Sequence, residues 1–328
     1  TFGMKKLLNI FVISFALVFS TSTFANKIGV IYDSGGKFDK SFNELAYNTA
    51  VRVQDELGWD MIEFEAANNT QIEQGMRKVA DRGATLVVAM GFAQADAVAA
   101  IAPQYPDVNF VAVDVCWVDD PAGNIYQACY LEHEGSFLVG VIAAMASKTG
   151  TIGFVGGMDI PLIRKFQGGY EQGALYANPD IKILANMTGT TPEAWNNPTK
   201  GAELTKAQID GGADVVYQAA GGTGIGVLQA AADAGIYGIG VDTNQNWMHP
   251  GSMLTSMLKR LDLTIFEQAE KTAAGTFEPG INILGLAEGM VGYATEDGMV
   301  TDEMAAAADA AAAGIIDGSI AVADWSQE

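Results

Sequence analysis

The stretch KIGVIYDSGGKFDKSFN, residues 27–43, decides the fold expected of this chain. Its apolar start predicts a buried strand, a glycine pair ends that strand in a turn, and a helix is expected to begin near Phe42. In open α/β sheets such loops lie at the carboxyl ends of strands, where ligands bind. A glycine-rich first turn is common to doubly wound domains, but this loop also offers two carboxylates, an amide and an aromatic ring. The four side chains are Asp33, Asp39, Phe42 and Asn43.

Strands and helices are expected to alternate along the rest of the chain. Helical patterns lie between continuous apolar runs, which are typical of buried parallel strands and occur at residues 85–90, 109–113, 151–155, 214–218 and 237–241. A turn at Gly156 and Gly157 opens the second series. About 300 residues exceed a single ordinary core. Two α/β series of similar size therefore predict two Rossmann-like lobes that face each other across a ligand cleft.

The first 25 residues are interpreted as a leader outside the fold. Residues 1–3 precede Met4 and resemble a cloning remnant. From Met4 to Ala25 the chain has the charged start, apolar centre and small-residue cleavage site of a secretory signal peptide. Cleavage after Ala25 would make Asn26 the mature start and predicts export to a periplasm. The alternative is an uncleaved anchor, but the apolar run is shorter than the roughly 18 to 20 residues of a spanning helix.

The acidic composition limits the class of ligand. The chain carries 18 Lys and Arg against 39 Asp and Glu, a formal charge of -21, and removal of Lys5 and Lys6 with the signal makes it -23. Such a surface repels phosphate backbones, which argues against nucleic acids and highly charged anions. A neutral or cationic small molecule fits better.

Cysteine and motif usage predict neither a cofactor nor a catalytic site. Cys116 and Cys129 are the two cysteines of the chain. In an oxidising compartment they can form one disulfide, although two buried free thiols explain them equally well. Cysteines and histidines do not occur at zinc spacing, and the motifs of a phosphate loop, a nucleophile elbow and a kinase are missing from the sequence.

Seven ordered blocks of sequence together resemble one family. They are DSGGKFDKSFN (33–43), FVAVD (110–114), EHEGSFLVG (132–140), IGFVGGMDIPLIRKFQGGYEQG (152–173), YQAAGGTGIGVLQAA (217–231), IGVDTNQ (239–245) and LTSMLKRLD (254–262). Over essentially its whole mature length the chain resembles the basic membrane protein, or PnrA-like, solute-binding proteins of ABC importers. The resemblance implies a type I periplasmic binding-protein fold. Its N-terminal lobe would comprise residues 26–132 and about 252–286, and its C-terminal lobe residues 133–251 and about 287–328.

The resemblance also implies that a purine nucleoside binds between the lobes. An aromatic face on each side of a purine contributes on the order of 1 to 3 kcal/mol by analogy with base stacking. Phe42 supplies one face, and Trp195 stands where family members commonly have phenylalanine, although a surface or core role would also explain it. Asp114 and Asp242, at two strand ends, are candidates to accept ribose hydroxyls. Lys259 would bond hydroxyl oxygens and balance Asp242.

Further candidates come from the loops around this site. Asp33 and Asn43 can read the edge of the base or orient their loop. Gly222 would let the sugar approach the backbone closely. Asp39 is explained equally well as a ligand residue and as a helix cap.

The resulting hypothesis is a monomeric receptor that captures a nucleoside by hinge closure and presents it to a membrane permease and its ATPase. The alternatives are the same role for a sugar, a flavin-like vitamin or a signalling molecule, an enzyme that processes nucleosides, and a transcriptional regulator of the same fold. The enzyme would need a metal-carboxylate cluster or a phosphate site. The regulator would need a DNA-binding unit in place of the signal. The choice between purine and pyrimidine depends on single donors and acceptors in the pocket and stays open.

Overall fold

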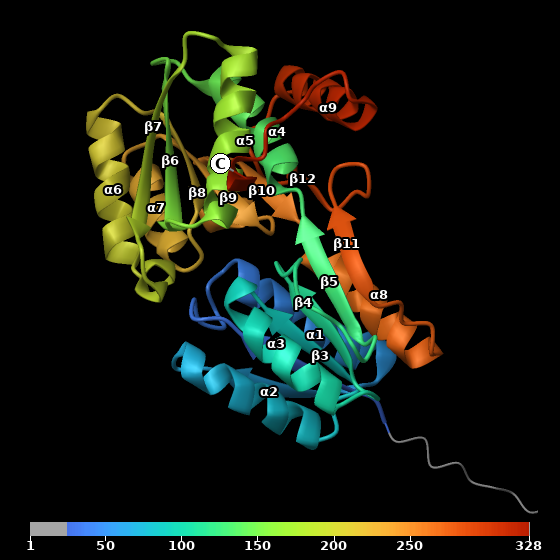
Figure 1. Cartoon of the computed structure of the whole chain (residues 1–328). Coiled ribbons are helices and arrows are strands. Elements are labelled where there is room, and N and C mark those ends of the chain that lie inside the picture. Colours follow the sequence, from blue (N-terminus) through green and yellow to red (C-terminus); the bar gives the residue numbers. More distant parts are fainter. Residues whose placement is uncertain (1–24, 328) are drawn as a thin grey trace, which may run out of the picture.

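The computed structural model describes residues 25–327 as two lobes, each built on a twisted sheet with helices on both faces (Figure 1). The fold class expected from the sequence, two Rossmann-like α/β lobes, is confirmed. The remnant and signal peptide expected in residues 1–25 lie, apart from Ala25, outside the described residues. Within the described part, no helix has the length and apolar character needed to cross a membrane.

The first lobe holds a six-stranded parallel sheet of order β11-β5-β4-β3-β1-β2. Its strands are β1 (Lys27–Tyr32), β2 (Asp60–Glu65), β3 (Leu86–Met90), β4 (Asn109–Val113), β5 (Ile125–Tyr130) and β11 (Gly280–Leu284). Apolar side chains on the two faces of this sheet form two cores. One core includes α1 (Phe42–Leu57) and α8 (Leu261–Ala274), and the other includes α2 (Ile72–Asp81) and α3 (Ala95–Ile101).

The second lobe repeats this plan with the order β12-β10-β9-β8-β6-β7. Its strands are β6 (Thr151–Met158), β7 (Lys182–Gly189), β8 (Val215–Ala219), β9 (Tyr237–Asp242), β10 (Met253–Lys259) and β12 (Val291–Tyr293). Only the β10–β12 pair among these is antiparallel. The larger core packs under α4 (Glu132–Ala146), α5 (Pro161–Ala177) and α9 (Asp302–Asp317), and the other face carries α6 (Pro198–Asp210) and α7 (Thr223–Asp233).

The chain crosses between the lobes three times: from β5 to α4, from β10 to α8 and from β11 to β12. The second crossing, expected from the sequence at about residue 252, lies later in the chain. Residues 253–258 pair in parallel with β9 in the second sheet, so the return to the first lobe begins only after Lys259. The shift matters because it puts Lys259 at the end of a second-lobe strand, beside the crossing.

Candidate ligand-binding site

A cavity lies where the two lobes face each other. The space between its walls, including the part that opens to solvent, is about 540 Å³. Its walls come from strand-end loops of both sheets. The lining residues are Asp33, Gly35, Asp39, Phe42, Gly91, Phe92, Asp114, Leu162, Ile163, Phe166, Trp195, Ala219, Ala220, Gly221, Val241, Asp242 and Lys259. Six of the eight residues predicted from the sequence are among them; Asn43 and Gly222 are not.

Two aspartates enter the cavity from equivalent places in the two lobes. Asp114 directly follows β4 and Asp242 ends β9. Both have left-handed backbone conformations, with φ of 62° and 69°. Aspartate tolerates this region better than most residues with a side chain. Both residues are buried, at 8% and 6% exposure. The arrangement thus supplies one buried carboxylate from each lobe.

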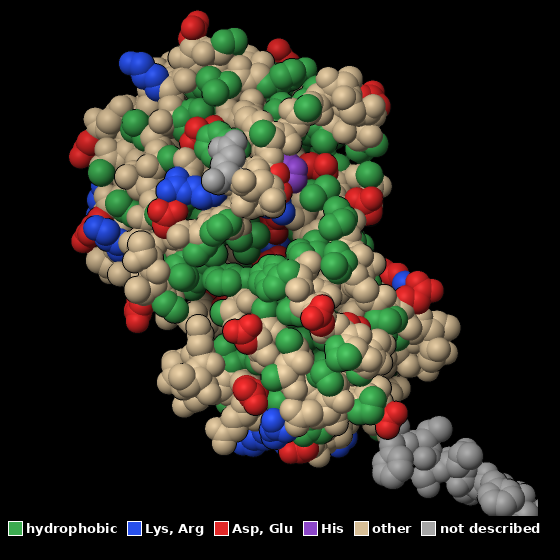
Figure 2. Space-filling model, viewed as in Figure 1, with side chains coloured by type: hydrophobic (Ala, Val, Ile, Leu, Met, Phe, Trp, Pro, Cys, Tyr) green, Lys and Arg blue, Asp and Glu red, His purple; other side chains and the backbone are tan. Residues whose placement is uncertain are grey.

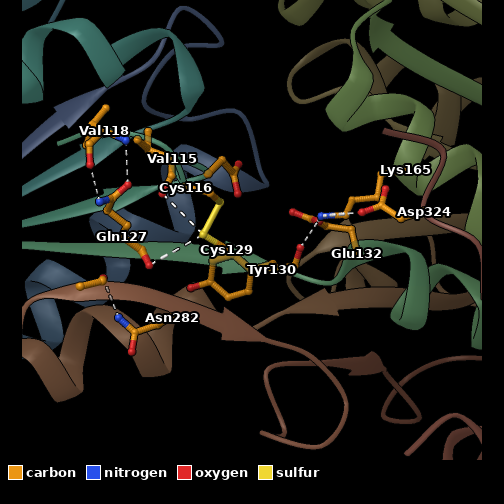
Figure 3. Close-up of a disulfide and its surroundings, with 12 residues drawn as sticks. Val115, Cys116, Val118, Gln127, Cys129, Tyr130, Glu132, Lys165, Asn282 and Asp324 are labelled. Atoms are coloured by element: carbon orange, nitrogen blue, oxygen red, sulfur yellow. Dashed lines mark hydrogen bonds and ion pairs between the residues drawn. A yellow bond between two sulfur atoms is a disulfide. The ribbon is translucent and has the colours of Figure 1, made fainter. Parts of the chain in front are cut away.

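Lys259 joins Asp114 to a third carboxylate, that of Glu132, in a charge cluster. Its Nζ lies 2.6 Å from Asp114 Oδ1 and 2.9 Å from Glu132 Oε1. Lys165 Nζ lies 3.2 Å from the other oxygen of Glu132 and 3.8 Å from Asp324, an alignment visible in Figure 3. From the sequence, Lys259 is expected to balance Asp242. The ion pairs instead go to Asp114 and Glu132, because the end of β10 faces the start of α4 at the crossing.

Burial and pairing set the protonation of this cluster. Burial raises the pKa of Asp114 to about 6, although Lys259 acts in the opposite direction. Burial likewise raises the pKa of Asp242 above its ordinary value, again opposed by Lys259. For Glu132 the balance is reversed: burial favours the neutral form, but Lys259 and Lys165 hold its pKa below the usual range. Burial disfavours the charge of Lys259, yet Asp114 and Glu132 raise its pKa, so its ammonium stays protonated.

The loop before α1 is fixed by its own side chains. Asn43 Nδ2 donates to Asp33 Oδ1 across 2.7 Å and to the carbonyl oxygen of Gly36 across 3.0 Å, while the Asp33 amide donates to Asn43 Oδ1. Asn43 is fully buried. Of its two predicted roles, the structure fits the orientation of the loop and not the reading of a base edge. Asp33 remains at the cavity wall.

Asp39 caps a helix and also lines the cavity. Its carboxylate accepts the backbone N–H groups of Ser41, Asn43 and Glu44 at 2.8, 3.0 and 3.1 Å. These are the free amides at the start of α1, so Asp39 caps the helix. It also lines the cavity.

Aromatic rings line the cavity from both lobes. Phe42 comes from the start of α1, and Trp195 from a short 3₁₀ turn, Pro192–Trp195, of the second lobe. Trp195 lies against Gly157, where an added Cβ would be 2.4 Å from the indole ring. The Lys259 ammonium lies 5.2 Å from the Phe42 ring centre and 5.6 Å from that of Phe166, within cation–π range.

Gly222 lies just behind the lining. Gly221 lines the cavity, while a Cβ at Gly222 would lie 3.1 Å from the Trp195 carbonyl oxygen and 3.4 Å from that of Gly35. The missing side chain therefore lets the two lobes approach each other.

Sequence reasoning missed Phe92, Phe166 and Glu132. Phe92 follows the end of β3 by two residues, so the strand-end argument that selected Asp114 would also have selected it. Phe166 and Glu132 lie on helices α5 and α4. Which face of those helices meets the cleft depends on how the lobes cross, and the local sequence pattern carries no such signal.

A disulfide supports the wall beside Asp114. The sequence leaves open whether Cys116 and Cys129 form a disulfide. In the structure they are bonded, which ties the segment after β4 to β5 (Figure 3). Gln127 closes the same segment, because its Nε2 donates to the Val118 carbonyl and its Oε1 accepts the Val118 amide. The disulfide faces a second, solvent-open hollow that adjoins the main cavity. Figure 2 shows hydrophobic side chains gathered at the boundary between the two lobes.

Among the described residues, no group of three or more His, Cys, Asp and Glu side chains is placed to hold a metal ion. The carboxylates of the cavity instead have lysine, hydroxyl, side-chain amide and backbone N–H partners. What the site offers is hydrogen-bond acceptors, one cation and aromatic faces in a cavity between the lobes.

Comparison with known proteins gives one family. The family described as "ABC transporter substrate-binding protein PnrA-like" matches residues 25–324. Basic membrane protein A2 of Borrelia garinii subsp. bavariensis is 34% identical over 303 residues, which are 90% of this chain and 88% of that protein. The ABC transporter nucleoside-binding protein BmpA of Lactococcus lactis subsp. cremoris is 31% identical over 319 residues, with 90% and 88% covered.

A solved structure agrees with this result. The ABC transporter solute-binding protein from Aeropyrum pernix K1 superposes with a TM-score of 0.81 at 26% identity, over 91% of this chain and 93% of that one. The type I periplasmic fold expected from the sequence is therefore confirmed.

Proposed function

Because this chain belongs to the PnrA-like family of ABC transporter substrate-binding proteins, we propose that it captures a purine nucleoside in the cavity and delivers it to an ABC permease and its ATPase. The family establishes the role of a solute-binding protein with a small-molecule ligand. The choice of nucleoside rests on the residues of the cavity, and the name of the Lactococcus relative is in line with it.

The observation that carries the proposal is the division of the cavity into aromatic and charged parts. Phe42 and Trp195, from opposite lobes, offer faces for a flat base, and stacking contributes about 1 to 3 kcal/mol per ring. Asp114, Asp242 and Lys259 offer acceptors and a donor to neighbouring hydroxyls, as a ribose needs. A free sugar has no flat base to stack between the aromatic faces, and a free base has no ribose hydroxyls to donate to the carboxylates at the strand ends.

The same charges argue against a phosphorylated ligand. The lining holds four acidic side chains, those of Asp33, Asp39, Asp114 and Asp242, and a single basic one, that of Lys259, so a 5′-phosphate would meet more acidic than basic groups. In this proposal the protein holds the nucleoside unchanged.

We further propose that residues 1–25 direct export and that the mature protein acts as a monomer in the periplasm. Solute-binding proteins of ABC importers work outside the cytoplasmic membrane, where the family role requires this chain to be.

The test is isothermal titration calorimetry on residues 26–328 after unfolding and refolding to strip bound ligand. Adenosine, guanosine, inosine, uridine, adenine, ribose and adenosine 5′-monophosphate are titrated separately. We expect tight binding of purine nucleosides, with Kd raised roughly ten- to hundredfold by Phe42→Ala and by Asp242→Ala.

Phe38→Ala is the matched control, because this ring lies in the same loop but is 60% exposed and outside the lining. It should leave Kd unchanged. If a folded sample binds no nucleoside, the nucleoside proposal is wrong. Tight binding of ribose alone would transfer the proposal to sugars.

A further inference from the structure

Direct hydrogen bonds join the two lobes beside the cavity. Ser41 Oγ donates to Asp242 Oδ2 across 2.5 Å and approaches the carbonyl oxygen of Val241 at 3.4 Å. Gln245 Nε2 donates to the carbonyl oxygen of Lys40 across 2.8 Å. Lys40 and Ser41 precede α1 in the first lobe, whereas the other residues end or follow β9 in the second. We call these bonds the clasp. They must break whenever the lobes separate.

The first-lobe half of the clasp is not needed by its own helix. Ser41 occupies the N-cap position of α1, where a serine hydroxyl usually binds a helix amide, but here its side chain makes no cap bond. Asp39 binds those amides instead. The Ser41 hydroxyl is fully buried, and within the described residues its hydrogen-bond partners all lie across the cleft. Lys40 has a φ of 62°, a conformation that few residues with a side chain adopt.

The second-lobe half is held ready by a glutamine pair. Gln245 Oε1 accepts hydrogen bonds from the Val241 backbone N–H and from Gln218 Nε2, both at 2.9 Å. The backbone N–H of Gln245 donates to Ser256 Oγ at 3.0 Å. These three bonds fix the side-chain amide of Gln245 so that Nε2 points at Lys40. The network is buried, with Gln245 at 1% exposure.

We propose that Ser41 is a positioning residue, which orients the Asp242 carboxylate for the ligand only when the lobes are closed. Asp242 is buried, lines the cavity and has one oxygen bound by Ser41, so its Oδ1 is the oxygen left for a ligand hydroxyl. Closure thus completes the ligand site, and opening releases the carboxylate. The inference rests on the proposed function only in taking a nucleoside as the molecule that Oδ1 meets.

The clasp should act on ligand release more than on capture. A ligand that meets the open form finds the clasp unmade, whereas release from the closed form requires breaking it. Loss of one buried hydrogen bond to a charged group is expected to change the equilibrium about 10- to 100-fold. Most of that change should appear in the dissociation rate.

Stopped-flow measurements with inosine test this. Ser41→Ala should speed dissociation about 10- to 100-fold and change association less than about threefold. Ser41→Thr, which keeps a hydroxyl, should restore slow release. The matched control is Thr49→Ala, because the Thr49 hydroxyl is also buried on α1 but donates to Leu45 within the helix, at 2.7 Å. Equal rates for Ser41→Ala and Thr49→Ala would overturn the proposal.

A second measurement needs no ligand, so the clasp and the nucleoside claim can fail separately. Spin labels are placed at cysteines introduced for Glu73 on α2 and Lys200 on α6, exposed positions on opposite lobes along one side of the molecule (Figure 1). We expect the closed, short-distance population to fall about tenfold in Ser41→Ala. A closed population equal to that of Thr49→Ala would contradict the proposal. If the closed population falls in Ser41→Ala but the protein binds no nucleoside, the role of the clasp is supported and the nucleoside proposal is refuted.

Discussion

Asp114 and Asp242 hold the chemistry of the cleft at the scale of single residues. Asp114 directly follows a central strand and Asp242 ends one. Both have left-handed backbone conformations, which cost an L-residue about 1 to 2 kcal/mol, and each is buried on its own lobe's side of the cavity. A cost of this kind is kept where the surrounding structure fixes the residue for a function. The sequence predicted both, because a buried strand pattern shows where its carboxyl end lies.

The titration of Asp114 should appear in the pH dependence of stability. Its pKa, about 6 in the folded protein because of burial, exceeds the ordinary 3.8. The folded state therefore binds this proton more tightly, so the associated stability is complete below about pH 4 and is lost as the pH rises through about 6. Relative to Asp114→Asn, the wild type should lose about 2 to 3 kcal/mol of unfolding free energy between pH 4 and 7 in urea titrations.

Asp180→Asn supplies the comparison, since Asp180 is exposed outside the cleft. Its difference from wild type should stay constant over the same range. A constant difference for Asp114→Asn as well would mean that Asp114 titrates normally and that its burial has no electrostatic consequence.

Charge partners were harder to predict than the aspartates. Lys259 was expected beside Asp242, but its ion pairs go to Asp114 and Glu132. Strand periodicity tells which residues reach a sheet edge, whereas the partner chosen there depends on how α4 leaves the first lobe. The choice of partner depends on tertiary packing, which the local sequence pattern does not contain. For the same reason Phe166 is absent from the predicted site.

At the scale of elements, the strand-loop-helix units were well predicted and the crossings were not. Residues 109–113 form β4 as expected, and the unit at 27–43 contains β1, the ligand loop and the start of α1. Residues 253–259 were assigned to the wrong lobe. An apolar strand has the same pattern in either sheet, so only its pairing with β9 decides the assignment.

The disulfide gives a prediction at this scale. Cys116 and Cys129 are 13 residues apart and join the segment after β4 to β5. Replacement of both by alanine should lower the free energy of unfolding by about 2 to 4 kcal/mol, because the unfolded chain is no longer constrained. Chemical denaturation with and without reductant measures this. Reductant should destabilise the wild type and leave the double variant unchanged, and a wild type insensitive to reductant under unfolding conditions would contradict it.

At the scale of the whole molecule, the cavity exists only because two lobes meet. Three crossings join them, so the lobes can turn about these short segments. Contacts across the cleft include the clasp and the Lys259 ion pair with Asp114. A ligand that touches Phe42 in one lobe and Trp195 in the other adds to them, and so favours the closed form by its differential contacts.

Small-angle scattering of ligand-stripped residues 26–328, with and without a saturating purine nucleoside, tests capture by closure most directly. Inosine is added to one sample, ribose to a second and buffer alone to a third. We predict that inosine lowers the radius of gyration and that ribose leaves it at the value in buffer. An unchanged radius of gyration with bound inosine would contradict closure, and a decrease caused by ribose alone would contradict the nucleoside as the captured ligand.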